Sequence, residues 1–525
     1  MSMKPFRHVE MFRPNRSVFD LSHYKLLDCD MGQLIPILCE KMVPGDHFKI
    51  SNEVVVRVQP MVAPIMHEIN LFVHYFFIPL RTMWPKPKVL DTDPVEDGSW
   101  EDFFTGGIDG LLEPEKPKWN PSLTHTGSYS LWDYFGHPIN TVPVGTLPDI
   151  WPLRGYNFCW NEYYRDQNYM DKVDLDEPSL KYRCWEKDYF TTALPWTQRG
   201  QAPALPITGI TNAQFLGQIQ GADYATLAPN NGAIFTQPSL GVTRLINFVG
   251  DSSAPTDVMI RNWFNNNQVD LSQASTFDVN DLRLAFQTQK FLERNARAGA
   301  RYIEQLRAHY GVSPRDDRLQ RPEYIGGTRQ PIVVSEVLQT SSTDGTSPQG
   351  NLAGHGLSVN RSYAGSYYAQ EFGILLGLMS IMPRPVYQQG IDRQWLGETR
   401  YDELLPEFVN LGEQPVYRSE LYATGVQSEN ETVFGFQGRY DEYRSRRSIV
   451  TGKMRTTAPS NFGFWHIARE FGSPPVLNAS FLECKPRKDF LAVPSEAGFI
   501  VTFGNIIRAV RPLPVVGTPG LIDHH

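Results

Sequence analysis

Short apolar runs separated by turns rich in proline and glycine recur along the whole chain. The run at 69–78 (INLFVHYFFI) is rich in β-branched and aromatic residues and is bounded by prolines, which predicts a strand. Because its apolar residues are nearly continuous rather than alternating, we expect this strand to be covered on both faces. Further strands are predicted at 54–59, 331–338, 372–382, 433–436 and 499–503.

One segment has a helical pattern instead. Over 281–310, apolar or small residues recur at spacings of three, four or seven, which predicts a single long helix with one buried face. Gly311 and Pro314 are expected to end it. The positions on the buried face are Ala285, Leu292, Ala296, Gly299, Ile303, Leu306 and Tyr310.

The remaining segments are predicted to be arms, loops and insertions. Residues 1–25 hold five basic and two acidic side chains and are expected to form an extended basic arm. The Ser- and Gly-rich stretch at 340–370 is expected to be a loop. Between 200 and 276 only six residues are charged while fifteen are Asn or Gln, which predicts a long neutral insertion presented at the surface. Strands spread along the chain with such insertions between them fit an antiparallel β-sandwich or jelly roll.

Composition and charge narrow the classes of protein. The 525 residues are 41% hydrophobic and 12% aromatic, with 41 Gly and 40 Pro, as in a globular β protein with elaborate loops. The net charge of −8 disfavours wrapping of nucleic acid by bulk electrostatics, so such contacts would require local patches or a basic partner. Five scattered cysteines, no secretory signal and no apolar run of about 20 residues indicate a soluble protein made in the cytoplasm, without a membrane span.

Catalytic and metal-binding motifs are missing from the sequence. It contains no GxSxG elbow, phosphate-binding loop, HExxH motif or EF-hand loop, so we expect no catalytic residue, no cofactor and no metal. His466 is expected to pack in a core. Paired carboxylates for glycoside hydrolysis are available in any acidic chain of this size, and a carbohydrate-active jelly-roll enzyme is therefore the alternative interpretation.

A local basic patch is the best candidate for nucleic-acid binding. The segment RYDEYRSRRSIVTGKMR (439–455) contains six basic residues, two acidic residues and two tyrosines. Arginine suits phosphate and tyrosine suits base stacking, but both are also enriched at subunit interfaces, so both interpretations stay open. The six basic residues are Arg439, Arg444, Arg446, Arg447, Lys453 and Arg455.

A series of motifs, in order along the chain, resembles the major capsid protein of the Microviridae, the small single-stranded-DNA phages, and most of all its gokushovirus branch. The segment 318–327 (RLQRPEYIGG) and the terminal PGLIDH (519–524) are the most diagnostic. The other matching segments are RSVFDLS (16–22), MGQLIPI (31–37), VPGD (43–46), FFIPLRTMW (76–84), DYFTTALPW (188–196), the whole of 281–327, QGIDRQW (389–395), LGEQPVY (411–417) and VFGFQGRYDEYR (433–444).

This resemblance implies a fold and a function. The fold would be one eight-stranded antiparallel viral jelly roll over 1–525, with long insertions between strands that contain some helices. Identical subunits would form a T=1 icosahedral shell around circular single-stranded DNA, in the virion, after assembly in the bacterial cytoplasm. Residues 200–276 would build a protrusion at the threefold axes that is available to a host receptor. The implied partners are a small basic DNA-packaging protein, a scaffolding protein and a DNA pilot protein.

Overall fold

The protein is mainly antiparallel β-sheet, as the sequence predicted. The computed structural model describes residues 15–88, 95–106, 111–202, 211–212, 268–269, 279–298, 301–313, 315–338 and 352–516. The chain divides into two compact units. The larger comprises residues 1–197 and 295–525, and the smaller comprises residues 198–294.

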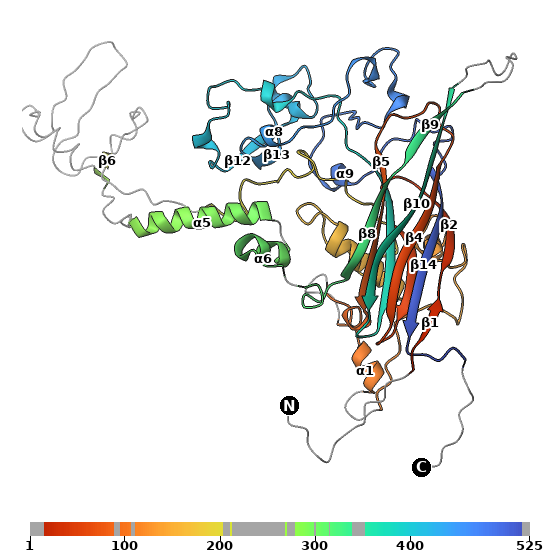
Figure 1. The fold of residues 1–525 in the computed structure, drawn as a ribbon. Coiled ribbons are helices and arrows are strands. Elements are labelled where there is room, and N and C mark those ends of the chain that lie inside the picture. The colour runs from red at the N-terminus through yellow and green to blue at the C-terminus, as the bar shows by residue number, and fades with distance from the viewer. Residues whose placement is uncertain are drawn as a thin grey trace, which may run out of the picture. The chain divides into compact units, whose positions relative to one another are not determined.

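Two sheets form the centre of the larger unit (Figure 1). The first has six strands in the order β1-β14-β4-β10-β9, with β2 also paired to β14. Every pairing in it is antiparallel. Its strands are β1 (Ser17–Asp20), β2 (His23–Cys29), β4 (His47–Val58), β9 (Val333–Leu338), β10 (Leu352–Tyr368) and β14 (Phe499–Arg511).

The second sheet has four antiparallel strands in the order β3-β11-β5-β8. The predicted strand at 69–78 is β5, and the prediction that it is covered on both faces is confirmed, since nine of its eleven residues are buried. Its neighbour β11 is buried along its whole length. The four strands are β3 (Ile35–Met42), β5 (Ile69–Pro79), β8 (Glu323–Pro331) and β11 (Gly373–Pro383).

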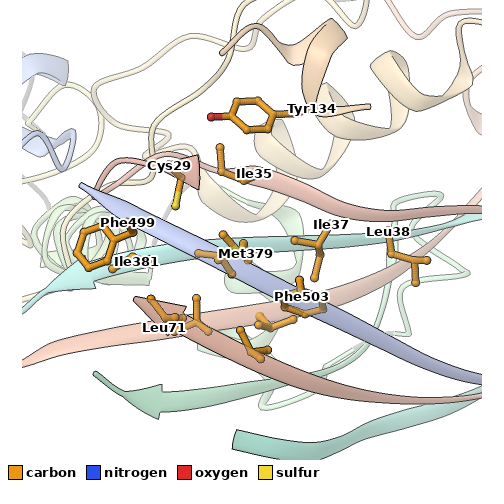
Figure 2. Packing of buried hydrophobic residues seen from close by; sticks show 14 of the residues in the cluster. Cys29, Ile35, Ile37, Leu38, Leu71, Tyr134, Met379, Ile381, Phe499 and Phe503 are labelled. Atoms are coloured by element: carbon orange, nitrogen blue, oxygen red, sulfur yellow. The ribbon is translucent and has the colours of Figure 1, made fainter. Parts of the chain in front are cut away.

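The main hydrophobic core lies between the two sheets. Leu71 and Met379 from the four-stranded sheet and Phe503 from the six-stranded sheet all belong to it, and Figure 2 shows them close together. Strand β4 alternates between buried and accessible residues, so the six-stranded sheet buries only the face that it turns to this core. This is the packing of a β-sandwich.

A second core covers the other face of the four-stranded sheet. Phe76 and Leu376 pack there with Trp151 and Tyr156 from α3 (Trp151–Cys159). A Cβ at Gly155 would lie 2.6 Å from Cδ1 of Ile374, so the absence of a side chain allows this helix to approach the sheet closely. The same insertion contains α1 (Trp100–Thr105), α2 (Leu131–Tyr134), η1 (Leu80–Thr82), η2 (Leu123–His125) and the π-helical turn η3 (Trp160–Tyr164).

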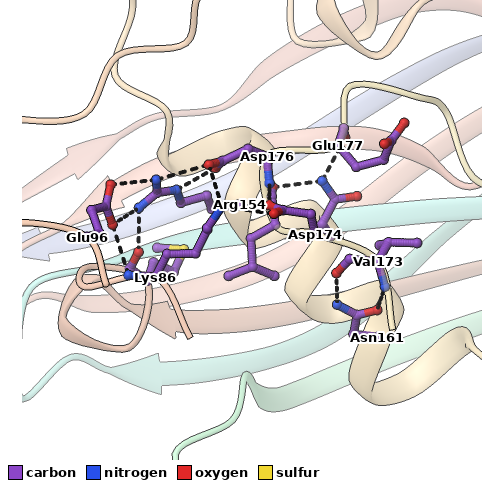
Figure 3. A network of polar contacts seen from close by, with 11 residues as sticks. Lys86, Glu96, Arg154, Asn161, Val173, Asp174, Asp176 and Glu177 are labelled. Carbon is purple, nitrogen blue, oxygen red and sulfur yellow. Dashed lines mark hydrogen bonds and ion pairs between the residues drawn. The ribbon is translucent and has the colours of Figure 1, made fainter. Parts of the chain in front are cut away.

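A buried arginine ties the loops of this insertion together (Figure 3). The guanidinium of Arg154 donates to both carboxylate oxygens of Glu96 at 2.8 Å and to Asp176 at 2.7 and 3.3 Å. It also donates to the carbonyl of Met83 at 2.8 Å. With only 3% of its side chain exposed, its charge is compensated by two carboxylates, as burial requires.

The segment between β11 and β14 is a third, mostly irregular part of the larger unit. Its short sheet pairs β12 (Glu413–Tyr417) with β13 (Val433–Gly438). Phe190, Val416 and Leu421 belong to the small hydrophobic core of this part. Its helical turns are η6 (Arg393–Trp395), η7 (Pro406–Phe408), η8 (Arg418–Glu420), α7 (Gln427–Asn430), α8 (Asp441–Arg444), η9 (Gly452–Met454), η10 (Gly463–Trp465) and α9 (Ala479–Leu482).

The single helix expected over 281–310 is wrong, because the structure has two helices there. They are α5 (Val279–Ala298) and α6 (Tyr302–Tyr310). Arg301 has an extended backbone and caps α6, with the Glu304 carboxylate accepting from its backbone N–H at 3.1 Å. Gly311 adopts a left-handed conformation (φ 70°) at the end of α6, as predicted, whereas Tyr310 is exposed rather than buried.

Two further expectations are corrected by the structure. Residues 340–370 are not simply a loop, because β10 is a strand of 17 residues that takes its hydrogen-bonding partners from β4 and β9. The end of the expected arm at 1–25 is likewise not free, since β1 and β2 pair with β14, and residues 1–14 lie outside the described residues. In both cases partners distant in sequence override weak local propensity.

Most of the neutral insertion at 200–276 also lies outside the described residues. In the smaller unit the structure describes β6 (Thr211–Asn212) paired with β7 (Gln268–Val269), and most of α5. The described helices include none that is long and apolar enough to cross a bilayer. All five cysteines are free thiols.

The orientation of the six-stranded sheet predicts different costs for one substitution at two positions of β14. Ile507→Ala should lower the free energy of unfolding by about 2–5 kcal/mol, because Ile507 is fully buried between the sheets. Ile500→Ala, on the exposed face of the same strand, should change it by less than about 0.5 kcal/mol. Denaturant unfolding of the unassembled chain measures both, and equal costs would contradict this assignment of faces.

Candidate nucleic-acid interface

The predicted basic patch at 439–455 begins where the chain leaves β13. Tyr440 has a left-handed backbone conformation (φ 63°) and precedes α8. Its ring is buried, and its hydroxyl donates to the carbonyl of Glu403 at 2.9 Å. This turn therefore fixes the direction in which the following basic residues leave the short sheet.

Two of the six predicted residues donate to backbone carbonyls of other loops, whereas Arg455 donates to the nearby carbonyl of Val450 at 3.2 Å. Arg439 donates to the carbonyl of Tyr401 and lies over the ring of Tyr440, 4.8 Å from its centre. Arg447 donates to the carbonyls of Glu420 and, at 3.1 Å, Gly390. Burial lowers the pKa of Arg447. These contacts join separate loops, which is a structural use of arginine.

The other four residues are exposed. Arg444 forms an ion pair with Asp441, and Arg446 lies 3.7 Å from Asp392. The structure thus separates the six residues into two that fasten loops and four that are accessible to a partner. That these four bind nucleic acid stays a prediction. The accessible residues are Arg444, Arg446, Lys453 and Arg455.

Glu420, whose backbone carbonyl accepts from Arg447 of this segment, has a buried carboxylate. Glu420 is 1% exposed, and its carboxylate accepts from Arg393 at 3.0 Å, from the backbone N–H of Tyr417 at 2.9 Å and from the hydroxyl of Tyr189 at 3.1 Å. Burial raises the pKa of Glu420, while Arg393 opposes that shift. The carboxylate holds together chain segments that are more than 200 residues apart, so its arrangement is that of a structural anchor.

A cavity of about 20 Å³ borders this carboxylate. Glu442 and Asp392 also line it, so three carboxylates surround one small space. A volume of this size holds about one water molecule, and a sugar ring does not fit. This cluster therefore gives no support to the carbohydrate-active alternative.

The part of the chain that the structure describes contains no candidate metal site. None of its His, Cys, Asp and Glu side chains gather in a group of three or more that could hold an ion. His466 is buried; its Nε2 lies 2.6 Å from the carbonyl of Met454, and its Nδ1 accepts from the backbone N–H of Ala468 at 3.1 Å. The expectation that this histidine packs in a core is confirmed.

The structure also brings together four cations that the sequence analysis did not identify. Lys49 and Arg57 on β4, Arg361 on β10 and Arg508 on β14 are all exposed. Lys49, Arg57 and Arg508 project from the face of the six-stranded sheet that is opposite the core, since the residues beside them in β4 and β14 are buried. Arg361 lies on the same face because it is paired with the exposed Glu53 of β4. The alternating pattern of β4 contained this signal, but the partner strands could not be known from sequence.

The described residues form a β-sandwich in which buried charges such as Arg154 and Glu420 fasten the loops of the insertions. The family model described as "Capsid protein (F protein)" matches residues 8–521. The chain belongs to this family of capsid proteins, and the resemblance to the Microviridae is confirmed.

Three relatives are similar over nearly their whole length. Capsid protein VP1 of Chlamydia phage 1 is 33% identical, with 98% of this chain and 97% of that protein covered. Capsid protein VP1 of Bdellovibrio phage phiMH2K is 30% identical with the same coverage. Capsid protein VP1 of Spiroplasma virus 4 is 28% identical, with 97% of each chain covered. A capsid protein is a component of the virion and assembles into a shell of many subunits.

The two groups of arginines predict different effects on stability. Arg447→Ala should lower the free energy of unfolding by about 2–3 kcal/mol, because it leaves two carbonyls without their donor. Its neighbour Arg446 is exposed and weakly paired, so Arg446→Ala should cost less than about 1 kcal/mol. Denaturant unfolding compares them. A similar cost for both would mean that Arg447 does not fasten these loops.

Proposed function

We propose that this chain is the structural subunit of a T=1 icosahedral shell that encloses a circular single-stranded DNA genome. The observation that carries the proposal is the match to the capsid protein family over residues 8–521. The shell would form from identical subunits, so large parts of the exposed surface would be buried against neighbouring copies. The specific geometry and the genome are inferred from the microvirus resemblance.

We further propose that the fold is the eight-stranded viral jelly roll. Support comes from the strand order: four strands in the order β2-β14-β4-β10 face four in the order β3-β11-β5-β8. The short strands β1 and β9 would then be additions at the edges of the first sheet. The insertions between strands would supply most of the contacts that distinguish this shell from others.

The charge of the chain supports a division of roles between proteins. At a net charge of −8 the subunit neutralises little of a genome, so a separate small basic protein would accompany the DNA. A scaffolding protein and a DNA pilot protein would complete the assembly in the bacterial cytoplasm. The neutral insertion at 200–276 would form a threefold protrusion, because an uncharged surface tolerates close copies of itself, and it would be available for host attachment.

Shell formation is the direct test of the proposal. The purified full-length chain, expressed alone and then together with the other structural proteins of its phage, should sediment as one large species. Negative-stain electron microscopy should show uniform icosahedral particles, because isometric closure requires identical subunits in identical environments. If only small oligomers form even with all of those proteins present, the proposed function is wrong.

The role of the insertion has its own test. Replacing residues 213–267 with a short Gly-Ser linker should leave particles that assemble but adsorb poorly to host cells. A control replacement with the same linker within 340–350, which belongs to the Ser- and Gly-rich stretch, should leave adsorption unchanged. Loss of assembly in the first variant would instead give the insertion a structural role.

A further inference from the structure

The outer face of the six-stranded sheet carries large apolar and aromatic side chains that the described part of the chain leaves uncovered. Tyr24 and Leu26 on β2 are 73% and 69% exposed, and Val359 and Tyr363 on β10 are 63% and 64% exposed. Ile500 on β14 is 57% exposed. A contiguous exposed patch of this kind marks a binding surface rather than ordinary scattered exposure.

The strand register arranges these side chains in rows. Leu26, Thr502, Val55 and Val359 lie in one row that crosses β2, β14, β4 and β10. Neighbouring strands are about 5 Å apart, so the row is a mostly apolar platform that crosses the four strands. In the next row Gly504 has no side chain, which leaves the middle of the face open.

Four cations lie on this face: Arg57 and Arg361 are in the rows next to the platform, and Lys49 and Arg508 share a row farther along the strands. Lys49, Arg57, Arg361 and Arg508 form no ion pair with a carboxylate of the described residues. Some exposed arginines elsewhere are paired: Arg315, for example, lies 3.1 Å from Asp317. The concentration of unpaired cations on one face indicates an anionic partner.

The register makes this arrangement unfavourable without such a partner. Lys49 lies directly opposite Arg508 on the neighbouring strand, and like charges in this position destabilise a sheet. Glu53 lies opposite Arg361, and Asp20 lies opposite Arg508, yet neither pair comes within ion-pair distance. Asp28 also lies on this face, opposite Ile500, so the four cations stand beside three carboxylates and the face retains a small positive charge although the chain as a whole is acidic.

We propose that this face binds single-stranded DNA, with unpaired bases on the tyrosines and the apolar row, and phosphates on the four cations. Aromatic side chains on an open sheet flanked by arginine and lysine are the arrangement that binds single strands. A duplex would hide its bases from the apolar row. A second copy of this face would bring the Lys49–Arg508 pair against the same charges. The inference rests on the proposed function, since that supplies a single-stranded genome to the subunit.

The test is binding of fluorescent oligothymidine to the unassembled full-length chain, measured by anisotropy over a range of salt concentrations. A variant combining Arg57→Gln, Arg361→Gln and Arg508→Gln should bind more weakly. The slope of log affinity against log salt should also fall by about 2, because each lost phosphate contact on a single strand removes roughly 0.7. A variant combining Tyr24→Leu and Tyr363→Leu should lose roughly fivefold or more in affinity per tyrosine, with an unchanged slope.

A matched control removes the same charge elsewhere. Arg315, Arg329 and Arg384 are exposed and paired with Asp317 or Glu68, so replacing all three with Gln should preserve both affinity and slope. Circular dichroism and thermal unfolding verify that every variant folds. Because each substituted side chain points away from the core, folding should be retained.

Three results would overturn the inference. One is wild-type affinity and slope in both sheet variants. Another is an equal loss in the control variant, which would mean that binding follows net charge alone. The third is loss of self-association in the sheet variants with DNA affinity unchanged, which would make this face a subunit interface. Shell formation by the wild-type chain is scored separately, so failure of this inference leaves the proposed function standing.

Discussion

The four-stranded sheet has to be buried on both faces, and the rest of the larger unit is arranged around this requirement. Strands β5 and β11 lie at its centre and expose almost no side chain on either side. One face is covered by the six-stranded sheet and the other by α3 and the aromatic residues packed around it. Without both layers the unit would expose two long apolar strands to water, at a cost of about 25 cal/mol for each Å² of apolar surface.

The six-stranded sheet is under the opposite constraint, because only one of its faces is required for the core. Its strands alternate, and the face turned away from the core carries both apolar side chains and unpaired cations. In a protein that remains monomeric, such a face would favour aggregation. In a capsid protein such a face is available to a partner, and in the assignment proposed above that partner is single-stranded DNA.

Buried charges have a different role in the insertions. Arg154 and Glu420 are each surrounded by several donors or acceptors from loops that are distant in sequence. Irregular segments expose many carbonyls that no strand or helix satisfies, and Arg447 satisfies two of them. Arginines in such a segment can therefore be present to bond loop carbonyls as well as to bind a ligand. This explains why the basic patch at 439–455 divides into fastened and accessible residues.

The sequence by itself determined that β5 is buried on both faces, that a helix ends at Gly311, and that the chain belongs to the capsid family through motifs along its length. Those features follow from local periodicity, backbone preference and residue identity. The tertiary structure alone decided that β10 is a strand and that the end of the N-terminal arm joins a sheet, because both depend on hydrogen bonds to distant strands. It also decided which cations stay unpaired. Whether Lys49 meets a carboxylate or Arg508 depends on the register between β4 and β14, more than 400 residues apart, and no local pattern encodes that register.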